Sequence, residues 1–291
     1  MTILITIAIH LNCATILLIE KYWAGEKMEE NISQNSRIIK YENGILRETQ
    51  DEIVRESPLT IFLNGQEFAT MVCTPEHLDE LVIGFLASEG FIRQKDEIKD
   101  IIIDENKGVA HVDLHVKVTA SHEFHSKRFI GSCCGKSRQF YFHNDARTAK
   151  TSTSKITLTP DNCLTIMKKL HDQSVIFRDT GGVHNAALFS RDKIIVCRTD
   201  IGRHNALDKI LGYCVENKIS AKDKIIAFSG RISSEVLLKA AKIGVGIILS
   251  KSAPTDLAIK LAEDLNITAI GFVRGDSFNI YSHSHRIVDQ L

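Results

Sequence analysis

The sequence has little of what would mark a disordered, membrane-spanning or nucleic-acid-binding protein. Its 291 residues include only four prolines, which argues against long disordered linkers. Lysine plus arginine equals aspartate plus glutamate at 36 each, so no net charge attracts the chain to nucleic acid or to an anionic membrane. Hydrophobic residues make up 44% and charged residues 25%, which is typical of a soluble globular protein. The length allows one large domain or two smaller ones.

The cysteines lack any spacing that suits a disulfide framework or a zinc site. Their number is odd, at seven, and no two are separated in a C-x-x-C pattern. Secreted disulfide-stabilised domains and structural zinc sites are both disfavoured, and we predict a protein of the reducing cytoplasm. The cysteines are Cys13, Cys73, Cys133, Cys134, Cys163, Cys197 and Cys214.

Several catalytic signatures are also absent. The sequence contains no H-E-x-x-H motif, no zinc-deaminase pair of H-x-E and P-C-x-x-C, no Walker A motif and no G-x-S-x-G motif. The histidines between His111 and His143 have spacings that match no compact set of metal ligands. We therefore predict no metal site.

Residues 1–27 differ from the rest of the chain. An apolar run from Ile3 to Ile19 is interrupted by His10 and Asn12, and no lysine or arginine precedes it. A signal peptide needs that basic start, and a membrane span needs a longer apolar run. We expect these residues to be an extension that the natural protein lacks, with Met28 as its true start.

Residues 28–119 are predicted to form a small α+β domain. Asn64-Gly65 lies between two apolar runs, which is a strong signal for a β-hairpin. Thr74 and Pro75 suit the start of the helix that follows. Further strands are expected at 101–103 and 109–118.

Residues 120–155 are polar and show little periodicity, which predicts a long mobile loop that connects two domains. Cys133 and Cys134 lie near its middle, among four basic residues. Nearby positive charge lowers the pKa of a thiol, and a thiolate on a mobile loop can carry sulfur as a persulfide. A buried structural cysteine and a chance vicinal pair are the alternatives. The basic residues are Lys127, Arg128, Lys136 and Arg138.

Residues 156–291 are predicted to form an α/β domain with a parallel-rich sheet flanked by helices. From Ile225 onward, short apolar runs alternate with segments of helical spacing. Strands and helices that alternate in this way form right-handed β-α-β crossovers. We expect strands at 183–189, 194–197, 225–228, 245–249, 267–273 and 278–281, with helices from 159 and at 205–213, 234–241 and 255–265.

Three consecutive strands of this domain end in similar polar turns. Parallel strands place their carboxyl ends at one edge of a sheet, so we expect these turns to lie together. Basic side chains, hydroxyl groups and two helix N-termini at one edge are typical of a phosphate or pyrophosphate site. Solvated basic residues in ordinary turns are the alternative. The turns are Ser229-Gly230-Arg231, Ser250-Lys251-Ser252 and Arg274-Gly275-Asp276-Ser277.

Two further motifs place histidine beside glycine or arginine, and both are candidate binding segments. A charged cap on a surface helix is the alternative for the second motif. The first contains Gly181, Gly182 and His184, and the second contains Asp200, Arg203, His204 and Asn205.

These motifs together resemble the FdhD family of formate dehydrogenase accessory sulfurtransferases. The resemblance extends from about Arg55 to Arg286, and separate motifs follow one another in the family's order. The matching segments are Ser57–Thr60, Cys73–Pro75, Gly84–Gly90, Thr180–His184, Asp200–Asn205, Ser229–Arg231 and Phe272–Gly275.

The resemblance implies a fold, a chemistry and partners. Family members are similar in fold to cytidine deaminases, without their zinc, and form homodimers. They accept sulfur from a cysteine desulfurase on a loop cysteine, which corresponds to Cys133. They pass it to the bis-molybdopterin guanine dinucleotide form of the molybdenum cofactor before that cofactor enters formate dehydrogenase. The cofactor-binding segment corresponds to Phe272, Val273, Arg274, Gly275, Asp276 and Ser277.

One departure from the family pattern limits the chemistry. Many relatives have C-x-x-C in this loop, whereas here Lys136 takes the second position and Cys134 adjoins Cys133. A single persulfide on Cys133 is therefore expected, with Cys134 at most an accessory. Two other functions compete with the sulfurtransferase. One is a non-catalytic chaperone that binds the cofactor at the basic turns. The other is a nucleotide-modifying enzyme, which the missing zinc ligands disfavour.

Overall fold

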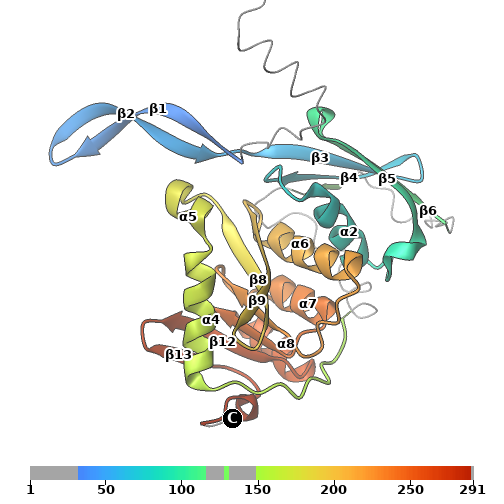
Figure 1. The fold of residues 1–291 in the computed structure, drawn as a ribbon, viewed down its shortest axis with the longest axis vertical. Coiled ribbons are helices and arrows are strands. Elements are labelled where there is room, and N and C mark those ends of the chain that lie inside the picture. The colour runs from blue at the N-terminus through green and yellow to red at the C-terminus, as the bar shows by residue number, and fades with distance from the viewer. Residues whose placement is uncertain (1–31, 116–127, 131–148, 290–291) are drawn as a thin grey trace, which may run out of the picture. The chain divides into compact units, whose positions relative to one another are not determined.

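Three β-sheets organise the computed structural model, which describes residues 32–115, 128–130 and 149–289 (Figure 1). Residues Ile32–Leu291 form one compact unit. The predictions for residues 1–27, and for Cys133 and Cys134, fall outside the described residues. The division into domains at 119 and 156 stays a prediction.

The six-stranded sheet and its helices occupy the last part of the chain. In order, they are α4 (Pro160–Asp172), α5 (Val175–Thr180), β8 (His184–Ser190), β9 (Lys193–Asp200), α6 (Arg203–Glu216), β10 (Ile225–Phe228), α7 (Ser234–Ile243), β11 (Ile247–Ser250), α8 (Asp256–Asp264), β12 (Thr268–Arg274), β13 (Ser277–Ile280) and the 3-10 helix η4 (Ser284–Arg286). The strand order is β13-β12-β11-β10-β8-β9. β10, β11 and β12 are parallel neighbours, and the remaining pairs are antiparallel. The predicted alternation of strands and helices is confirmed, but the predicted parallel-rich sheet is not. Three of the five strand pairs are antiparallel, because β8–β9 and β12–β13 are hairpins and β10 pairs antiparallel with β8.

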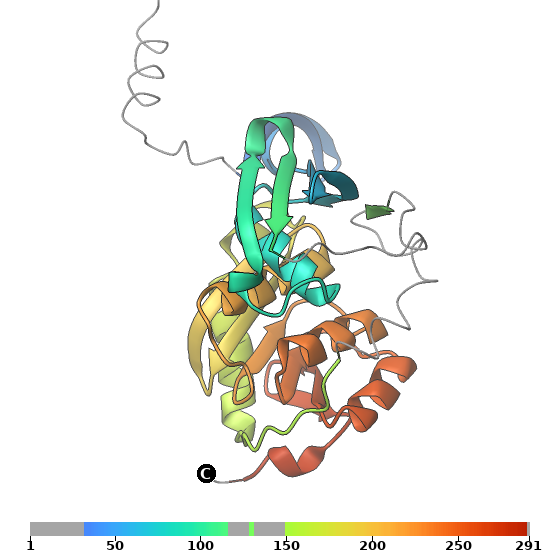
Figure 2. The same cartoon turned by 90° about the vertical axis from the view of Figure 1, so that its right-hand side faces the viewer.

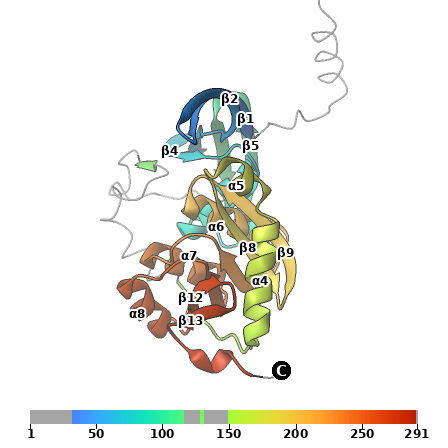
Figure 3. The same cartoon turned by 90° about the vertical axis from the view of Figure 1, so that its left-hand side faces the viewer.

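Alternate residues of these strands face two layers of helices. α4 covers one face, where Ile166 shares a buried cluster with Phe189. α6, α7 and α8 cover the other face, where Ile210 shares a cluster with Phe228 (Figure 3). β10 and β11 are therefore buried on both sides, which explains their uninterrupted apolar runs. The predicted α/β class is confirmed, and the likeness to cytidine deaminases stays a prediction.

The five-stranded sheet packs with one helix and is drawn in blue-green in Figure 2. Its elements are β3 (Ser57–Leu63), β4 (Gln66–Cys73), α2 (Leu78–Ser88), the 3-10 helix η1 (Lys95–Glu97), β5 (Ile98–Asp104), the 3-10 helix η2 (Glu105–Lys107), β6 (Val109–Leu114) and β7 (Arg128–Ile130). The strand order is β5-β6-β3-β4-β7. Asn64 and Gly65 both have positive φ at the β3–β4 turn, so the predicted hairpin is confirmed.

The start of α2 differs from the prediction. The helix begins at Leu78, after His77 in the left-handed conformation, and not at Pro75. Thr74 does not cap the helix, because its polar groups bond elsewhere. Its Oγ1 accepts a hydrogen bond from Ile201 N at 3.0 Å, and its N–H donates to Asp200 Oδ2 at 3.2 Å. A contact distant in sequence therefore overrides the local capping signal.

A two-stranded ribbon precedes β3 and was not predicted from the sequence. It consists of β1 (Ser33–Glu42) and β2 (Ile45–Val54), which pair antiparallel along their full length. Asn43 and Gly44 form the turn, with φ of 52° and 82°. This is the same Asn-Gly signal that identified the β3–β4 hairpin.

The helices α2 and α6 cross so closely that only glycine fits at the contact. A Cβ on Gly84 would lie 1.8 Å from Asp208 O, and one on Gly212 would lie 1.9 Å from Glu80 O. Since both obstacles are backbone carbonyls, no side-chain movement can make room. The crossing joins the five-stranded sheet to the six-stranded one.

We expect Gly212→Ala to lower the free energy of unfolding by about 3 kcal/mol, because the helices must separate to admit the methyl group. In a helix without such a neighbour, the same substitution would raise the free energy of unfolding by up to about 1 kcal/mol. The sign of the change in the free energy of unfolding therefore shows whether the crossing excludes a methyl group. Urea unfolding provides the measurement, with Lys260→Ala at an exposed position of α8 as the control. A stabilised Gly212→Ala variant contradicts the close crossing.

Candidate functional site at the carboxyl edge of the six-stranded sheet

The turns after β10, β11 and β12 meet at one end of the sheet, as expected from parallel strands. Ser250 Oγ donates a hydrogen bond to Gly230 O at 2.6 Å, which joins the first two turns. Arg274 Nε donates to Lys251 O at 2.8 Å, which joins the second and third. We call this surface the polar edge, and it comprises Ser229–Arg231, Ser250–Ser252 and Phe272–Ser277.

Two helices begin beside the polar edge. Ser233 caps α7 and Thr255 caps α8, and each side chain accepts a hydrogen bond from a backbone N–H of the first turn. A backbone bridge between Ile232 and Pro254 holds the two helix starts together. Helix N-termini carry partial positive charge, so they add to the attraction of nearby basic side chains for an anion.

The third turn of the polar edge contains a strained aromatic residue. Phe272 has a φ of 53° and is 39% exposed. Bulky residues rarely adopt this left-handed conformation, which costs of the order of 1–3 kcal/mol. The guanidinium of Arg274 lies 5.6 Å from the centre of the Phe272 ring. The turn therefore presents an aromatic face and a fixed cation together.

The other cations of the polar edge differ in their surroundings. Arg231 is exposed. Lys251 Nζ lies 3.1 Å from His171 Nδ1 of α4, and Asp276 contributes one carboxylate to the third turn. Basic groups are thus present in all three turns, and such groups are favourable partners for a phosphate or pyrophosphate.

Two histidines reach the same end of the sheet from β8 and α6. A Cβ on Gly230 would lie 3.3 Å from His184 Nδ1, so His184 adjoins the polar edge. His204 Nε2 lies 3.1 Å from Glu235 Oε2 of α7. Burial, followed by the positive charge of Arg203, lowers the pKa of His184. Its imidazole is therefore neutral near neutral pH and can both donate and accept a hydrogen bond.

Asp200 and Asn205 lie in the interior, although the sequence placed them among the cofactor-binding residues. Asp200 Oδ2 lies 2.7 Å from Nζ of Lys209, and both side chains are fully buried. Asp200 Oδ1 accepts hydrogen bonds from Gly202 N at 2.8 Å and from Asn205 Nδ2 at 3.0 Å. Both residues therefore position the start of α6. Lys209 escapes prediction because a helical lysine is normally solvated.

Gly181 is required by its backbone conformation, and Gly182 is required by close packing. Gly181 ends α5 with a φ of 66°, a conformation that favours glycine. A Cβ on Gly182 would lie 2.7 Å from Val54 Cγ1, so a larger residue would press against β2. The two glycines thus shape the approach of the chain to His184.

The described cysteines are poorly suited to nucleophilic chemistry. Burial raises the pKa of the Cys73, Cys163 and Cys214 thiols to about 12 each. Burial likewise raises the pKa of Cys197 to about 11. Such thiols stay protonated near neutral pH, whereas the thiolate is the reactive form. Cys133, the predicted reactive cysteine, lies outside the described residues.

The described residues offer neither a metal site nor a membrane-crossing helix. No three His, Cys, Asp or Glu side chains in the described ranges gather closely enough to hold a metal ion. No helix within those ranges is long and apolar enough to span a membrane.

Comparison with known proteins decides the family. Residues 54–288 match the model of the FdhD/NarQ family. This chain belongs to that family. It is 60% identical over 260 residues to the sulfur carrier protein FdhD of Staphylococcus haemolyticus (strain JCSC1435), which covers 89% of this chain and 98% of that protein. It is 59% identical over 251 residues to the sulfur carrier protein FdhD of Geobacillus kaustophilus (strain HTA426), covering 86% and 95%.

A solved structure supports the fold of this FdhD/NarQ family member. The crystal structure of a formate dehydrogenase accessory protein from Desulfotalea psychrophila matches with a TM-score of 0.72 at 24% identity. The match covers 89% of this chain and all of that one. The family resemblance predicted from the motifs is confirmed. The family match contains the whole polar edge and begins at Val54, the last residue of β2.

We expect Lys209→Met to lower the free energy of unfolding by about 3–5 kcal/mol, since it leaves the Asp200 carboxylate buried without its cation. Chemical denaturation measures the change, with Lys260→Met on the exposed side of α8 as the matched control. A loss below about 1 kcal/mol in Lys209→Met would show that the buried pair contributes little.

Proposed function

We propose that this FdhD/NarQ family member is a sulfurtransferase that serves formate dehydrogenase. It accepts sulfur from a cysteine desulfurase as a persulfide on Cys133. It then passes the sulfur to the bis-molybdopterin guanine dinucleotide form of the molybdenum cofactor, which is its client and not a resident group. The names of the curated relatives, which are sulfur carrier proteins FdhD, support the sulfur-carrying role.

The meeting of three basic turns at the polar edge is the observation that carries this proposal. Each guanine dinucleotide half of the client contains a pyrophosphate. Arg231, Lys251 and Arg274 supply positive charge from three neighbouring turns, beside the starts of α7 and α8. Phe272 offers an exposed ring on which a planar base can stack. We assign the nucleotide portions of the client to this surface, with His184, Arg203 and His204 at its border.

The proposed transfer proceeds through two balanced exchanges at sulfur. The Cys133 thiolate attacks the terminal sulfur of the desulfurase persulfide, and the desulfurase cysteine leaves as a thiolate. In the second exchange the S–S bond on Cys133 breaks, and its electron pair remains on the Cys133 sulfur. The acceptor must supply the two electrons that bind the transferred sulfur, and a reduced molybdenum centre can do so. Cys133 returns to its thiolate.

The setting of the protein follows from the same proposal. A persulfide carrier requires reduced thiols, which agrees with the cytoplasm inferred from the cysteine pattern. The client has two nucleotide halves, and a homodimer would present two polar edges. A homodimer is therefore part of the proposal, together with the desulfurase donor and the formate dehydrogenase recipient.

A non-catalytic chaperone is the competing function, because the polar edge itself contains no cysteine and the described cysteines are largely buried. The two functions differ in what they require of Cys133. The chaperone needs only the basic turns, whereas the sulfurtransferase needs both the turns and the thiol.

We expect Cys133→Ser to abolish sulfur loading, because serine has no thiolate to attack the donor's sulfur and cannot hold a persulfide. Intact mass spectrometry after incubation with a desulfurase and cysteine should show one added sulfur atom in the unaltered protein and none in the variant. Cys134→Ser is the matched control and should retain loading. Formate dehydrogenase that matures normally with Cys133→Ser would favour the chaperone.

We expect Arg231→Ala to weaken binding of guanosine diphosphate about tenfold, since one charge-assisted contact to phosphate is lost. Isothermal titration calorimetry provides the measurement. Lys260→Ala, which removes a cation elsewhere on the surface, should bind like the unaltered protein. Equal affinity in all three proteins would remove the polar edge from the proposal.

A further inference from the structure

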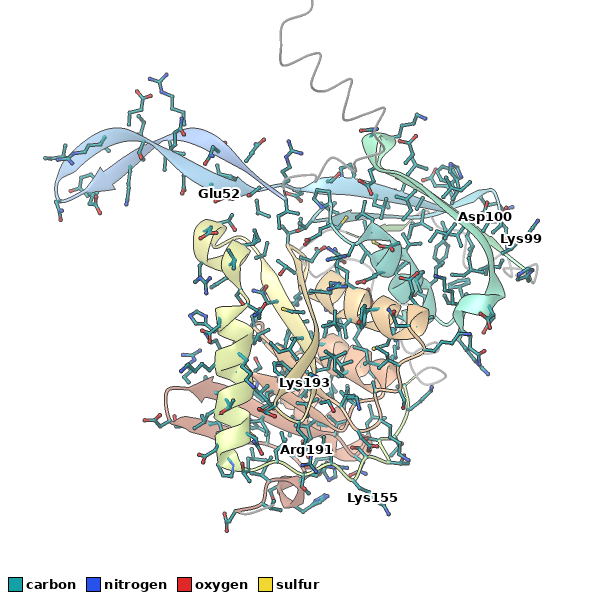
Figure 4. All side chains as sticks on the ribbon, viewed as in Figure 1. Glu52, Lys99, Asp100, Lys155, Arg191 and Lys193 are labelled. Carbon is teal, nitrogen blue, oxygen red and sulfur yellow. The ribbon has the colours of Figure 1, made fainter. Side chains whose placement is uncertain are left out.

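The β1–β2 ribbon takes no part in the polar edge, yet it exposes large apolar side chains. Tyr41 and Leu46 near its turn are each 69% exposed, and Ile39 is 64% exposed. Ile45 and Ile53 are 51% and 41% exposed. Figure 4 shows side chains projecting from both faces of the ribbon. Apolar residues gathered on a protruding element are typical of an interaction surface.

The outer edges of the ribbon have no strand partner in the described part of the chain. Two strands alone are marginally stable in water, and unpaired edges offer N–H and C=O groups to another strand. Glu42 and Ile45 close the two-residue turn, so they form a hydrogen-bonded pair and the pattern alternates from there. The outward backbone groups of β2 therefore belong to Leu46, Glu48, Gln50 and Glu52.

Charge is distributed unevenly along one face of the ribbon. Near the turn, Lys40 lies directly opposite Arg47, so two cations face each other. Toward the base, the same face carries Asp51 opposite Ser36. Opposite charges across a strand pair stabilise a sheet, and like charges destabilise it. Glu42, at the turn on the same face, pairs with Lys40, so Arg47 is the cation of the tip that favours an anionic partner, and Asp51 at the base favours a cationic one.

We propose that the β2 strands of two copies of this chain pair antiparallel about a two-fold axis at Thr49. The inference rests on the homodimer in the proposed function and identifies its contact surface. Arg47 then lies opposite Asp51 of the partner subunit, and symmetry makes this pair twice. Ile45 lies opposite Ile53 of the partner subunit. Every residue of β2 up to Asp51 is exposed and free to meet the second strand.

Charge selects this register over its neighbours. A register shifted one step toward the turn places Glu48 opposite Glu48 of the partner subunit. A shift the other way places Glu48 opposite Glu52 of the partner subunit. Both create like-charge pairs, which destabilise a strand pair. Of these three registers, only the one centred on Thr49 avoids such pairs, and it pairs the outward backbone groups along most of β2.

The β1 edge is less suited to the same role. If the β1 strands of two copies pair antiparallel about Ile38 or Ile39, no residues of opposite charge face each other. If they pair about Arg37, the two Arg37 residues face each other, and like charges destabilise the pair. Arg37 already pairs with Glu48 within the ribbon. A β1 register centred on Tyr41 would oppose Lys40 to Glu42, but the two strands would overlap only over residues 40–42 before the turn, so self-complementary charge over a longer overlap points to β2.

A charge exchange tests the pairing. Arg47→Asp should raise the dimer dissociation constant about tenfold, because two attractive pairs become repulsive. The double variant Arg47→Asp with Asp51→Arg should restore association, since the charges exchange places. Sedimentation velocity measures both, with Lys260→Asp as the control and circular dichroism to check folding. Unchanged association in Arg47→Asp, or no recovery in the double variant, would overturn the inference.

Cross-linking tests the register independently. At the two-fold axis, Thr49→Cys brings two Cα atoms within about 5 Å, which suits a disulfide. This variant should cross-link under mild oxidation much faster than the unaltered protein. Ile45→Cys should not cross-link with itself but should do so when mixed with Ile53→Cys. Self-linking of Ile45→Cys, or no linking of Thr49→Cys, contradicts the register.

Sulfur loading of Cys133 in the same preparations separates the two proposals. Intact loading together with failed cross-linking overturns the strand pairing alone. Specific cross-linking together with failed loading overturns the sulfurtransferase and leaves the pairing supported.

Discussion

The arrangement of the site depends on one buried ion pair. Lys209 Nζ lies 2.7 Å from Asp200 Oδ2, and it also donates to Thr74 O at 3.2 Å and to Thr199 O at 3.1 Å. Removing two charges from water costs several kcal/mol for each ion, so such a pair persists only when hydrogen bonds satisfy both partners. Here they do, and the same bonds connect the end of β4 to the end of β9. The pair therefore fixes one sheet relative to the other.

The helix crossing adds a second constraint on α6. Gly84 and Gly212 let the backbones of α2 and α6 touch, and two ion pairs flank the contact. In the first pair, Arg198 Nε of β9 lies 2.5 Å from Glu80 Oε2 of α2. In the second, Lys239 Nζ of α7 lies 2.5 Å from Asp208 Oδ1 of α6. With α6 held from both sides, its first turn keeps Arg203 and His204 at the border of the polar edge. A ligand that contacts these groups would find them already oriented, which reduces the entropic cost of binding.

Local signals and parallel topology account for much of what the sequence predicts. The Asn64-Gly65 hairpin and the run from β10 to β12 follow from turn chemistry and from hydrophobic periodicity. Parallel strands then require the three polar turns to share an edge. The same reasoning fails where distant residues compete for a polar group. Thr74 has the local character of a helix cap, but Asp200 and Ile201 take its bonds.

The interior role of Asp200 and Asn205 has no local signal either. Both residue types are normally exposed, and tertiary partners make their burial tolerable: Lys209 and Thr74 N for Asp200, and Val72 O for Asn205. The closeness of α2 to α6 likewise depends on two glycines that lie far apart in sequence. By contrast, the β1–β2 turn does have a local signal, because Asn43-Gly44 is the same hairpin dipeptide as Asn64-Gly65 and both of its residues adopt positive φ.

The chemistry of the described thiols bears on where the proposed sulfur transfer can take place. Burial keeps Cys73, Cys163, Cys197 and Cys214 protonated, and none of them belongs to the polar edge. If the polar edge holds a pyrophosphate, the sulfur must arrive on a thiol supplied from outside the described residues. A carrier thiol needs access to both a donor and an acceptor, whereas a nucleotide site needs rigid donors. Under the proposed function, placing the two tasks on different segments satisfies both requirements and agrees with the cations of the polar edge and the protonated cysteines among the described residues.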